Sequence, residues 1–451
     1  MPTYNFRPIE QQDVIDDSKV AKADVIGAIG NITNPLLDLP LNNSLAMKQG
    51  AGSVEFSRTQ SAYTPWSSTY NYLTGYTASY GGHNYRALQN SLDQTPSIGS
   101  AYWQIEAPTY RDRYGLLKYA KSDEPRFEKE GLLIEGTSTN KLTYSNNLSD
   151  VSWEDPLNVW TAVSHTATAP DGTATASRID FTGTSVPSIR KTFLANAGAT
   201  YTVSFFGKIE NGNITTMTAD IGDGVQVNFN GTLSTEYQRF SVTCVAGAVG
   251  RLDLNFSSIN GDRIVVWGFQ VEELPFATSY IPTTTEAVTR TSDNLVVTRE
   301  NNLPDIEDNA DGFTTIFDYD ILGVGNNLAW LLSVYVNSSN SVRLGAVSSG
   351  GVFQYGVENA TADIIKSDTG VVYNTKYREA ITLSNSLISR FSNGVGVSSL
   401  LNSTGKLSES CNSNNLLYIG KVGTIEQYMY GHISNIRVYD RALTAQEIAL
   451  A

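Results

Sequence analysis

Aromatic side chains concentrate in one short part of the chain, residues 63–108. Flat aromatic rings can stack on the apolar C–H faces of sugar rings, whose hydroxyl groups then need amide or carboxylate partners. Asn84, Asn90 and Gln104 supply amides within the same stretch. The large rings are Tyr63, Trp66, Tyr70, Tyr72, Tyr76, Tyr80, Tyr85, Tyr102 and Trp103. These residue types predict a surface that binds carbohydrate by stacking and hydrogen bonding.

Most of these rings have a competing role, because a small β-module needs bulky side chains to build its core. Any single ring is therefore more simply explained as a core residue, and one or two rings are left for a ligand-binding face. Trp66 and Trp103 are the first candidates for carbohydrate binding, followed by Tyr80 and Tyr85. Alternatively, the module binds a neighbouring protein subunit rather than a sugar.

Sequence motifs for catalysis are absent from the chain. It has no G-x-S-x-G elbow, no H-E-x-x-H motif and no phosphate-binding G-x-x-x-x-G-K-[ST] loop. His83, His165 and His432 fall in three different units, which favours surface or strand roles over that of a catalytic base. The 45 acidic residues leave room for the paired carboxylates of a glycosidase, but their spacing indicates no pair. We predict no catalytic residue and no enzymatic activity.

One acidic stretch is loosely similar to a calcium-binding loop, which needs oxygen ligands at alternate positions and a glycine turn. It contains Glu307, Asn309, Asp311, Gly312 and Asp318. Its first ligand position is Glu rather than Asp, and its last is Asp rather than Glu. A solvated acidic turn is the better interpretation, so we predict no metal ion and no cofactor.

Charge and composition disfavour several classes of partner. The chain has 31 Lys and Arg residues against 45 Asp and Glu residues, a formal net charge of -14, which argues against nucleic acid and anionic lipid. Cys244 and Cys411 are too few for a disulfide scaffold or a zinc cluster. The first residues are polar and acidic, and no apolar run reaches about 18 residues, so we expect no signal peptide and no membrane insertion. A neutral glycan is compatible with this surface.

The elements that position these residues are predicted to be strands. Short apolar runs alternate with turn signals over residues 146–282, and seven strand-like runs follow over residues 295–451. This pattern predicts two β-sandwiches. Apolar residues at roughly helical spacing in Asp16–Ile29 predict a short helix, either in a frayed terminus or in an anchor that orders against a partner. Thr444 and Glu447 form a capping box that predicts a helix at the other end.

The aromatic stretch resembles the small chitin- and cellulose-binding modules of carbohydrate-binding families 5 and 12. The residues that match the family pattern are Tyr72, Gly75, Tyr80, Gly82, Tyr85, Ala87, Pro96 and Trp103, after an opening Trp66. Tyr76 stands where the family has Asp, and Ala78 stands where it has Val. These departures affect a turn and leave the aromatic frame intact, so the resemblance implies a carbohydrate-binding module.

The segments on either side of this module resemble bacteriophage tail fibre proteins. VEFSRTQSA and TYRDRYGLLKYAKSDEPRFEKEGLLIEGTSTN usually run together in those proteins, so the module looks like an insertion at about 63–108. Such an insertion into a surface loop costs little entropy. FQVEELPFATSYIPTTTEAVTRTSDN resembles the close of the jelly-roll module of the same proteins, and the resemblance spans about 52–294.

The last part of the chain, LLYIGKVGTIEQYMYGHISNIRVYDRALTAQEI, resembles the final strands of concanavalin A-like and laminin G-like sandwiches. The resemblance implies that Gly431 opens a strand and that Ile433, Ile436 and Val438 face the core. It also implies a turn at Asp440 and Arg441 before a helix that starts at Leu443. This resemblance specifies the fold better than the ligand.

Together these features predict an all-β chain of consecutive β-sandwich domains, jelly-roll and concanavalin A-like, with a small inserted β-module and a short N-terminal helical or extended anchor. The expected divisions are a virion-attachment segment (1–51), a fibre connector (52–145) that contains the insert (63–108), a jelly-roll domain (146–294) and a concanavalin A/laminin G-like domain (295–451).

The resemblance to tail fibres implies a virion protein that is made in the host cytoplasm and forms a homotrimer. It would bind host surface polysaccharide without cleaving it, and it would contact other virion proteins through its N-terminal segment. One alternative is a structural virion protein of the collar, baseplate or head, whose sandwiches make protein contacts. A second alternative is a polysaccharide depolymerase.

Overall fold

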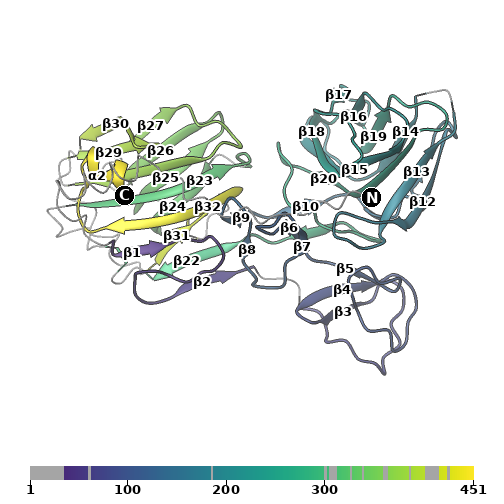
Figure 1. Cartoon of the computed structure of the whole chain (residues 1–451), viewed down its shortest axis with the longest axis horizontal. Helices are drawn as coiled ribbons and strands as arrows, with labels where there is room; N and C mark the ends of the chain where they lie inside the picture. Colours follow the sequence, from purple (N-terminus) through teal and green to yellow (C-terminus); the bar gives the residue numbers. More distant parts are fainter. Residues whose placement is uncertain are drawn as a thin grey trace, which may run out of the picture.

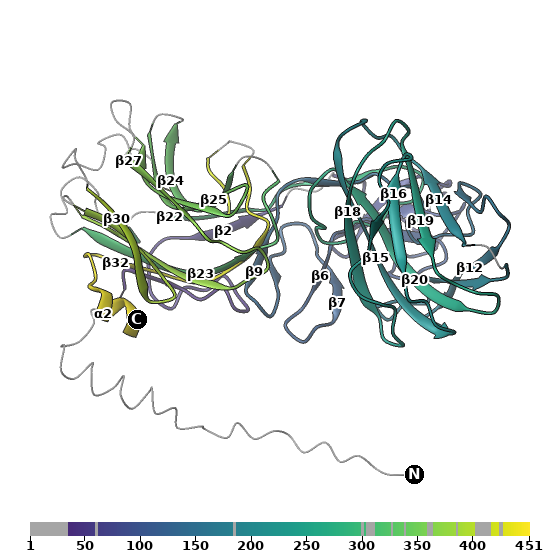
Figure 2. The same cartoon turned by 90° about the horizontal axis from the view of Figure 1, so that it is seen from above.

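A computed structural model of the chain describes residues 35–58, 62–183, 186–298, 302–303, 312–325, 328–337, 340–358, 364–384, 387–401, 416–423 and 427–451. The described elements are almost all strands, which form two β-sandwiches at opposite ends of the long axis (Figure 1). Figure 1 shows a small β-module below the sandwich formed by the middle of the chain, and Figure 2 shows a short ribbon between the two sandwiches. The prediction of an all-β chain of sandwich domains is confirmed.

The middle sandwich is built from two five-stranded sheets. Its first sheet has the order β11-β14-β19-β16-β17, with bounds Trp153–Glu154, Ser188–Thr192, Arg251–Phe256, Met217–Ile221 and Val227–Asn228. Its second sheet has the order β12-β13-β20-β15-β18, with bounds Trp160–Ala167, Ala176–Phe181, Arg263–Glu272, Thr200–Asn211 and Gln238–Val245. The facing sides of these sheets form one hydrophobic core.

The C-terminal sandwich also has two sheets. One has the order β30-β29-β28-β23-β32-β9-β8, with β1 also paired to β32; the bounds are Val395–Leu401, Leu387–Ser392, Tyr377–Leu383, Phe313–Ile321, Gly431–Tyr439, Leu132–Ile134, Arg126–Phe127 and Leu37–Leu39. The other has the order β2-β22-β31-β24-β25-β26-β27, with bounds Val54–Ser57, Asn294–Thr298, Leu416–Ile419, Leu328–Asn337, Asn340–Ser348, Val352–Glu358 and Ile364–Thr369. α2 (Ala445–Leu450) follows β32.

The C-terminal sandwich therefore takes strands from parts of the sequence that we assigned elsewhere. β1 lies within the expected virion-attachment segment, yet Leu37 and Leu39 are fully buried in the core of this sandwich. β2, β8 and β9 lie within the expected connector. A three-residue strand between two prolines carries too little periodicity to be recognised in sequence. The helix expected at Asp16–Ile29 lies outside the described residues.

The expected packing of the last strand is confirmed. β32 begins at Gly431, and Ile433, Ile436 and Val438 are all fully buried. Ile433 and Ile436 are three residues apart and would point to opposite faces of a regular strand. Both face the core because Asn435 has a φ of 53° and the pairing with β23 shifts register there. The helix begins at Ala445, with Thr444 as the N-cap of the expected capping box, rather than at Leu443.

The aromatic module consists of β3 (Thr77–Tyr80), β4 (His83–Ala87) and β5 (Trp103–Ile105). Two ribbons accompany it: β6 (Thr109–Arg111) pairs with β7 (Leu117–Tyr119), and β10 (Ser138–Asn140) pairs with β21 (Val288–Arg290). Trp103 and Tyr72 of the module share one hydrophobic cluster with Trp267 and Val265 of β20. The module therefore covers the outer face of a sandwich sheet instead of hanging from a loop.

A buried ionic network connects the segments that run between the sandwiches. Arg126 Nη1 donates to Glu135 Oε2 at 2.5 Å and to Ser279 Oγ at 2.7 Å, while Nη2 donates to Asp293 Oδ2 at 2.5 Å. Arg58 Nη1 donates to the other oxygen of Asp293 at 3.0 Å. The charged side chains are at most 1% exposed. Burial removes water from these charged groups, so each one is stabilised by the opposite charges and hydrogen bonds of the others.

Replacing the central arginine tests this network. We expect Arg126→Met to lower the free energy of unfolding by about 3–5 kcal/mol, because the buried carboxylates of Glu135 and Asp293 both lose a charged hydrogen-bond donor. Chemical denaturation followed by tryptophan fluorescence measures the loss. Arg263→Met is the matched control, since the pair between Arg263 and Asp180 is partly exposed and should contribute about 0–1 kcal/mol. Equal losses in the two variants would contradict the prediction.

Candidate carbohydrate-binding site

The four rings that sequence selected for carbohydrate binding separate into two groups. Trp103 is 1% exposed and Tyr85 is 4% exposed, and both lie in the core that joins the module to β20. Trp103 Nε1 donates to the carbonyl of Gln94 at 2.7 Å, which fixes the indole in place. The faces of Trp103 and Tyr85 are therefore covered by protein, which corrects their expected role as stacking platforms.

Trp66 and Tyr80 keep contact with solvent. Tyr80 is 45% exposed, and the half-buried Trp66 meets it edge to face with ring centres 5.6 Å apart. Tyr70 and Tyr76, which sequence did not select, are 51% and 43% exposed and stack with ring centres 6.4 Å apart. Tyr70 and Tyr76 flank the turn that precedes β3, and side chains beside a turn are commonly exposed. We call these four residues the aromatic surface.

A second candidate site is a cleft of about 520 Å³ between the module and the middle sandwich. One wall comes from the module and includes Gln89, Ser100 and Gln104. The opposite wall comes from the sandwich and its flanking segments, with residues Tyr144, Asn146, Asn147, His165, Asp171, Ala174, Thr175, Thr283 and Thr284. Amide and hydroxyl groups occur on both walls, beside apolar side chains.

Packing at the rim of the cleft holds the two walls at a defined distance. Gly99 in the module has a φ of 75°, and a Cβ at this position would lie 2.9 Å from Thr173 Cγ2 of the sandwich. A larger residue would be strained by this backbone and would push the walls apart. Tyr119, from the ribbon β6–β7, donates its hydroxyl to Asp171 Oδ2 at 2.8 Å. Burial, and then Asp171, raise the pKa of Tyr119 well above its usual value, so the phenol stays a donor.

The polar groups of the cleft are partly engaged by the protein itself. Asn146 Oδ1 accepts a hydrogen bond from the backbone N–H of Gly268 at 2.8 Å, and Gln104 Nε2 donates to the carbonyl of Ile105 at 3.1 Å. Thr284 is 5% exposed, and its Oγ1 finds no hydrogen-bond partner among the described residues. A buried hydroxyl without a partner is costly, so this cleft wall favours a ligand or water that hydrogen-bonds there.

The aromatic part of the sandwich wall is Tyr144. Its backbone N–H donates to the carbonyl of Thr284 at 2.6 Å, and Lys191 Nζ lies 5.2 Å from its ring centre. Burial lowers the pKa of Lys191 to about 8, although Asp150 and Glu154 oppose this shift. Sequence reasoning missed Tyr144, Asn147 and Asp171, because they approach Gln104 only after the module packs on the sandwich.

An open groove on the outer face of β14, β19 and β16 has a different character. Its lining carries Arg190, Arg251, Asp220 and Asp253. Arg251 Nε donates to Asp253 Oδ2 at 2.5 Å, and Arg190 pairs with the other oxygen of Asp253. These arginines and Asp253 pair with one another across the sheet surface, which leaves them less available to a ligand. The groove is therefore a weaker candidate for a neutral ligand than the cleft.

The acidic stretch that is loosely similar to a calcium-binding loop is described only in part. Glu307, Asn309 and Asp311 lie outside the described residues, whereas Asp318 accepts a hydrogen bond from Asn435 Nδ2 at 2.8 Å. The histidines do lie in separate units, as expected: His83 in the module, His165 in the middle sandwich and His432 in the C-terminal sandwich. Within the described part of the chain, no helix has the length and apolar character needed to cross a lipid bilayer.

Comparison with known families supports the assignment of one domain. Residues 302–449 match the family described as the concanavalin A-like lectin/glucanases superfamily. The C-terminal sandwich is a concanavalin A-like, laminin G-like domain. This agrees with the resemblance of its last strands and with the two-sheet architecture. No curated protein matches the chain.

Several solved structures resemble parts of the chain at low similarity. The carbohydrate-binding module of family 40 from the Ruminococcus gnavus IT-sialidase, bound to α2,3-sialyllactose, is 16% identical with a TM-score of 0.28, over 31% of this chain and 82% of that chain. Domain 4 of the arabinanase AbnA from Geobacillus stearothermophilus, in complex with arabinotriose, is 13% identical with a TM-score of 0.28, over 39% and 81%. A putative carbohydrate-binding protein from Bacteroides ovatus is 11% identical with a TM-score of 0.28, over 70% and 84%. Resemblances at these scores do not inform ligand or role.

The carboxyl group of Asp220 in the groove gives a pH-dependent prediction. Burial, and then Asp253, raise the pKa of Asp220 to about 6, so the folded chain holds a proton that the unfolded chain releases near pH 4. Stability should therefore fall as pH rises from about 4 to 6. Asp220→Asn removes this charge, so its melting temperature should exceed that of the wild type at pH 7 and match it near pH 4. A difference that is independent of pH would contradict the prediction.

Burial of Trp103 predicts a loss of stability rather than a local loss of binding. We expect Trp103→Ala to lower the free energy of unfolding by about 3–5 kcal/mol, as large core aromatics do. Tyr80→Ala should change it by less than about 1 kcal/mol, because almost half of that side chain is already exposed. Chemical denaturation of both variants measures these values. Similar small effects in both would show that Trp103 is not part of the core.

Proposed function

We propose that this chain is a non-catalytic glycan-binding protein whose main ligand site is the cleft between the module and the middle sandwich. The observation that carries the proposal is the concave shape of about 520 Å³, whose apolar lining also carries amide and hydroxyl groups on both walls. A concave site with a few convergent polar groups is typical of small-molecule and oligosaccharide binding.

The chemistry of the walls fits a neutral sugar better than a charged ligand. Gln104 and Asn147 line a space that, among the described residues, is also lined by the carboxylate of Asp171 and by no lysine or arginine. Sugar hydroxyls donate to such oxygens and accept from such amides. Thr284 offers a further hydroxyl without a partner among the described residues. The net charge of -14 disfavours anionic polymers such as nucleic acid.

The aromatic surface supplies the second element of this proposal. Tyr70, Tyr76 and Tyr80 expose about half of their side chains, and exposed rings of this kind stack on sugar faces. A neighbouring protein subunit could use the same rings. This keeps the structural virion role as the alternative function, since exposed apolar patches mark either kind of partner.

We further propose a biological setting from the resemblance of residues 52–294 to tail fibre proteins. In this setting the chain is a bacteriophage tail fibre or tail appendage that attaches to host surface polysaccharide. Assembly as a homotrimer, contact with other virion proteins through the N-terminal segment and synthesis in the host cytoplasm belong to the same proposal. Their support is the resemblance of the sequence alone.

Glycan-array binding of the full chain tests the proposed function. We expect Gln104→Ala and Asn147→Ala each to weaken binding to a responsive glycan at least about tenfold, because each removes an amide that a sugar hydroxyl would use. Tyr114→Ala is the matched control, since Tyr114 is 81% exposed on the ribbon β6–β7 and lines neither site. Circular dichroism and melting curves check that all variants fold.

The other outcomes separate the alternatives. Loss of binding in Tyr70→Ala or Tyr76→Ala, with the cleft variants unchanged, would move the glycan site to the aromatic surface. Folded protein that binds no host polysaccharide would overturn the proposal in favour of the structural virion role. Release of new reducing ends from purified capsule or lipopolysaccharide would show a depolymerase instead.

A further inference from the structure

The turn that joins β8 to β9 is fixed against the last strand of the C-terminal sandwich. Glu128 N donates to the carbonyl of Gly131 at 2.9 Å across this turn, and Leu133 of β9 pairs with His432 of β32. Gly131 has a φ of 144°, and a Cβ there would lie 2.7 Å from the carbonyl oxygen of Ile433. The turn thus holds Glu128, and Glu130 two residues later, beside β32.

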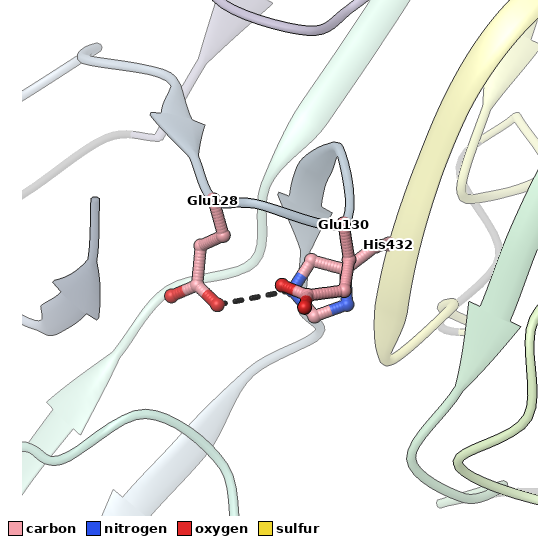
Figure 3. A group of neighbouring side chains, drawn as sticks. All are labelled: Glu128, Glu130 and His432. Carbon is pink, nitrogen blue, oxygen red and sulfur yellow. Dashed lines mark hydrogen bonds and ion pairs between the residues drawn. The ribbon is translucent and has the colours of Figure 1, made fainter. Parts of the chain in front are cut away.

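His432 is held so that one ring nitrogen faces these glutamates. The residue is 8% exposed, and its Nδ1 lies 3.0 Å from Asp320 Oδ1 of β23. Its Nε2 lies 3.1 Å from Glu128 Oε2, and the other oxygen of Glu128 accepts the backbone N–H of Arg111 at 2.7 Å. Figure 3 shows the carboxylate of Glu128 directed at the imidazole of His432, with the carboxylate of Glu130 over the same ring in this view. One ligand atom of each of these three residues lies within 4.8 Å of the others.

The charge of this cluster is unbalanced. Three carboxylates, from Glu128, Glu130 and Asp320, surround one imidazole, so the group stays negative even when the histidine is protonated. Among the described residues, no lysine or arginine side chain forms an ion pair with any of these three carboxylates. Two of them belong to the connector and one to β23, so repulsion acts across the contact between the turn and the sandwich.

We propose that Glu128, Glu130 and His432 bind a zinc ion, with Asp320 as the positioning residue that orients the imidazole. Zinc takes histidine nitrogen and carboxylate oxygen at about 2.0–2.2 Å, so neighbouring ligands of a tetrahedral site lie about 3.3 Å apart. The 3.1 Å separation of Nε2 and Glu128 Oε2 is close to this value. A carboxylate on the second histidine nitrogen is the usual outer-shell partner of a zinc-bound imidazole.

The nature of the ligands selects the metal. Calcium and magnesium prefer sites made entirely of oxygen, whereas an imidazole beside two carboxylates suits zinc and related transition metals. A water molecule would complete the coordination. The bound ion would join the connector turn to β32 and β23, and its role is that of a structural clamp, independent of the glycan proposal.

Calorimetric titration of the chelator-treated full chain with zinc chloride tests the proposal. We expect one zinc ion per chain with micromolar or tighter affinity, and a rise in melting temperature on binding. Glu130→Gln should weaken binding at least about tenfold without disturbing the fold, because Glu130 is exposed. Asp320→Asn should weaken it about 10–100-fold through the imidazole. Cobalt(II) offers a second readout, since tetrahedral coordination gives a strong visible absorption that Glu130→Gln should abolish.

His165→Ala is the matched control, because His165 is exposed on β12, away from the turn. It should leave stoichiometry and affinity unchanged. Absence of zinc binding to the wild type would overturn the proposal, and the cluster would then be a protonated histidine bridging Asp320 and Glu128. Zinc binding that survives in Glu130→Gln and Asp320→Asn, or that His165→Ala removes, would place the metal elsewhere and would equally overturn it.

Discussion

The arrangement of the two sandwiches depends on the buried charges around Arg126. Burial alone would raise the pKa of Glu135, but Arg290 and Arg126, with hydrogen bonds from Ser279, hold it well below its usual value. Asp293 is shared between Arg126 and Arg58, partners 167 and 235 residues away in sequence. Such a network is costly unless every member is in place. It therefore forces the connector, the end of the middle sandwich and the start of β22 to meet in one geometry.

The sequence predicted the structural features that depend on local pattern and residue type. The strand-like runs, the capping box of Thr444 and Glu447, and the inward-facing residues of β32 follow from periodicity and turn chemistry, which act over a few residues. β26 and β27 were not singled out. β27 is the edge strand, and its largely polar sequence, Ile364–Thr369 (IIKSDT), gives the weak apolar signal that is common at a sheet edge.

The candidate sites could be predicted only in part, because they form between distant segments. The density of aromatic rings identified the module. In the sequence, however, rings that are buried in the core shared with β20 cannot be distinguished from rings on the module's surface. The run RIVVWGFQV did carry a signal, since a strand apolar at consecutive positions is buried on both faces. Trp267 of that run needs a partner outside the sandwich, and Trp103 belongs to the cluster that provides it.

This shared core changes what an inserted module can do. A module tethered by loops alone would sample many orientations, and a ligand bridging it to the sandwich would have to order it first. Here Trp103 and Trp267 lie in one buried cluster, and Gly99 closes against Thr173 at the rim. The free-energy cost of positioning both cleft walls belongs to folding. A ligand that bridges Gln104 and Asn147 would therefore lose less of its binding free energy to ordering the module. Trp103 and Tyr85, which sequence assigned to sugar stacking, would thus contribute to the proposed binding by fixing the shape of the cleft.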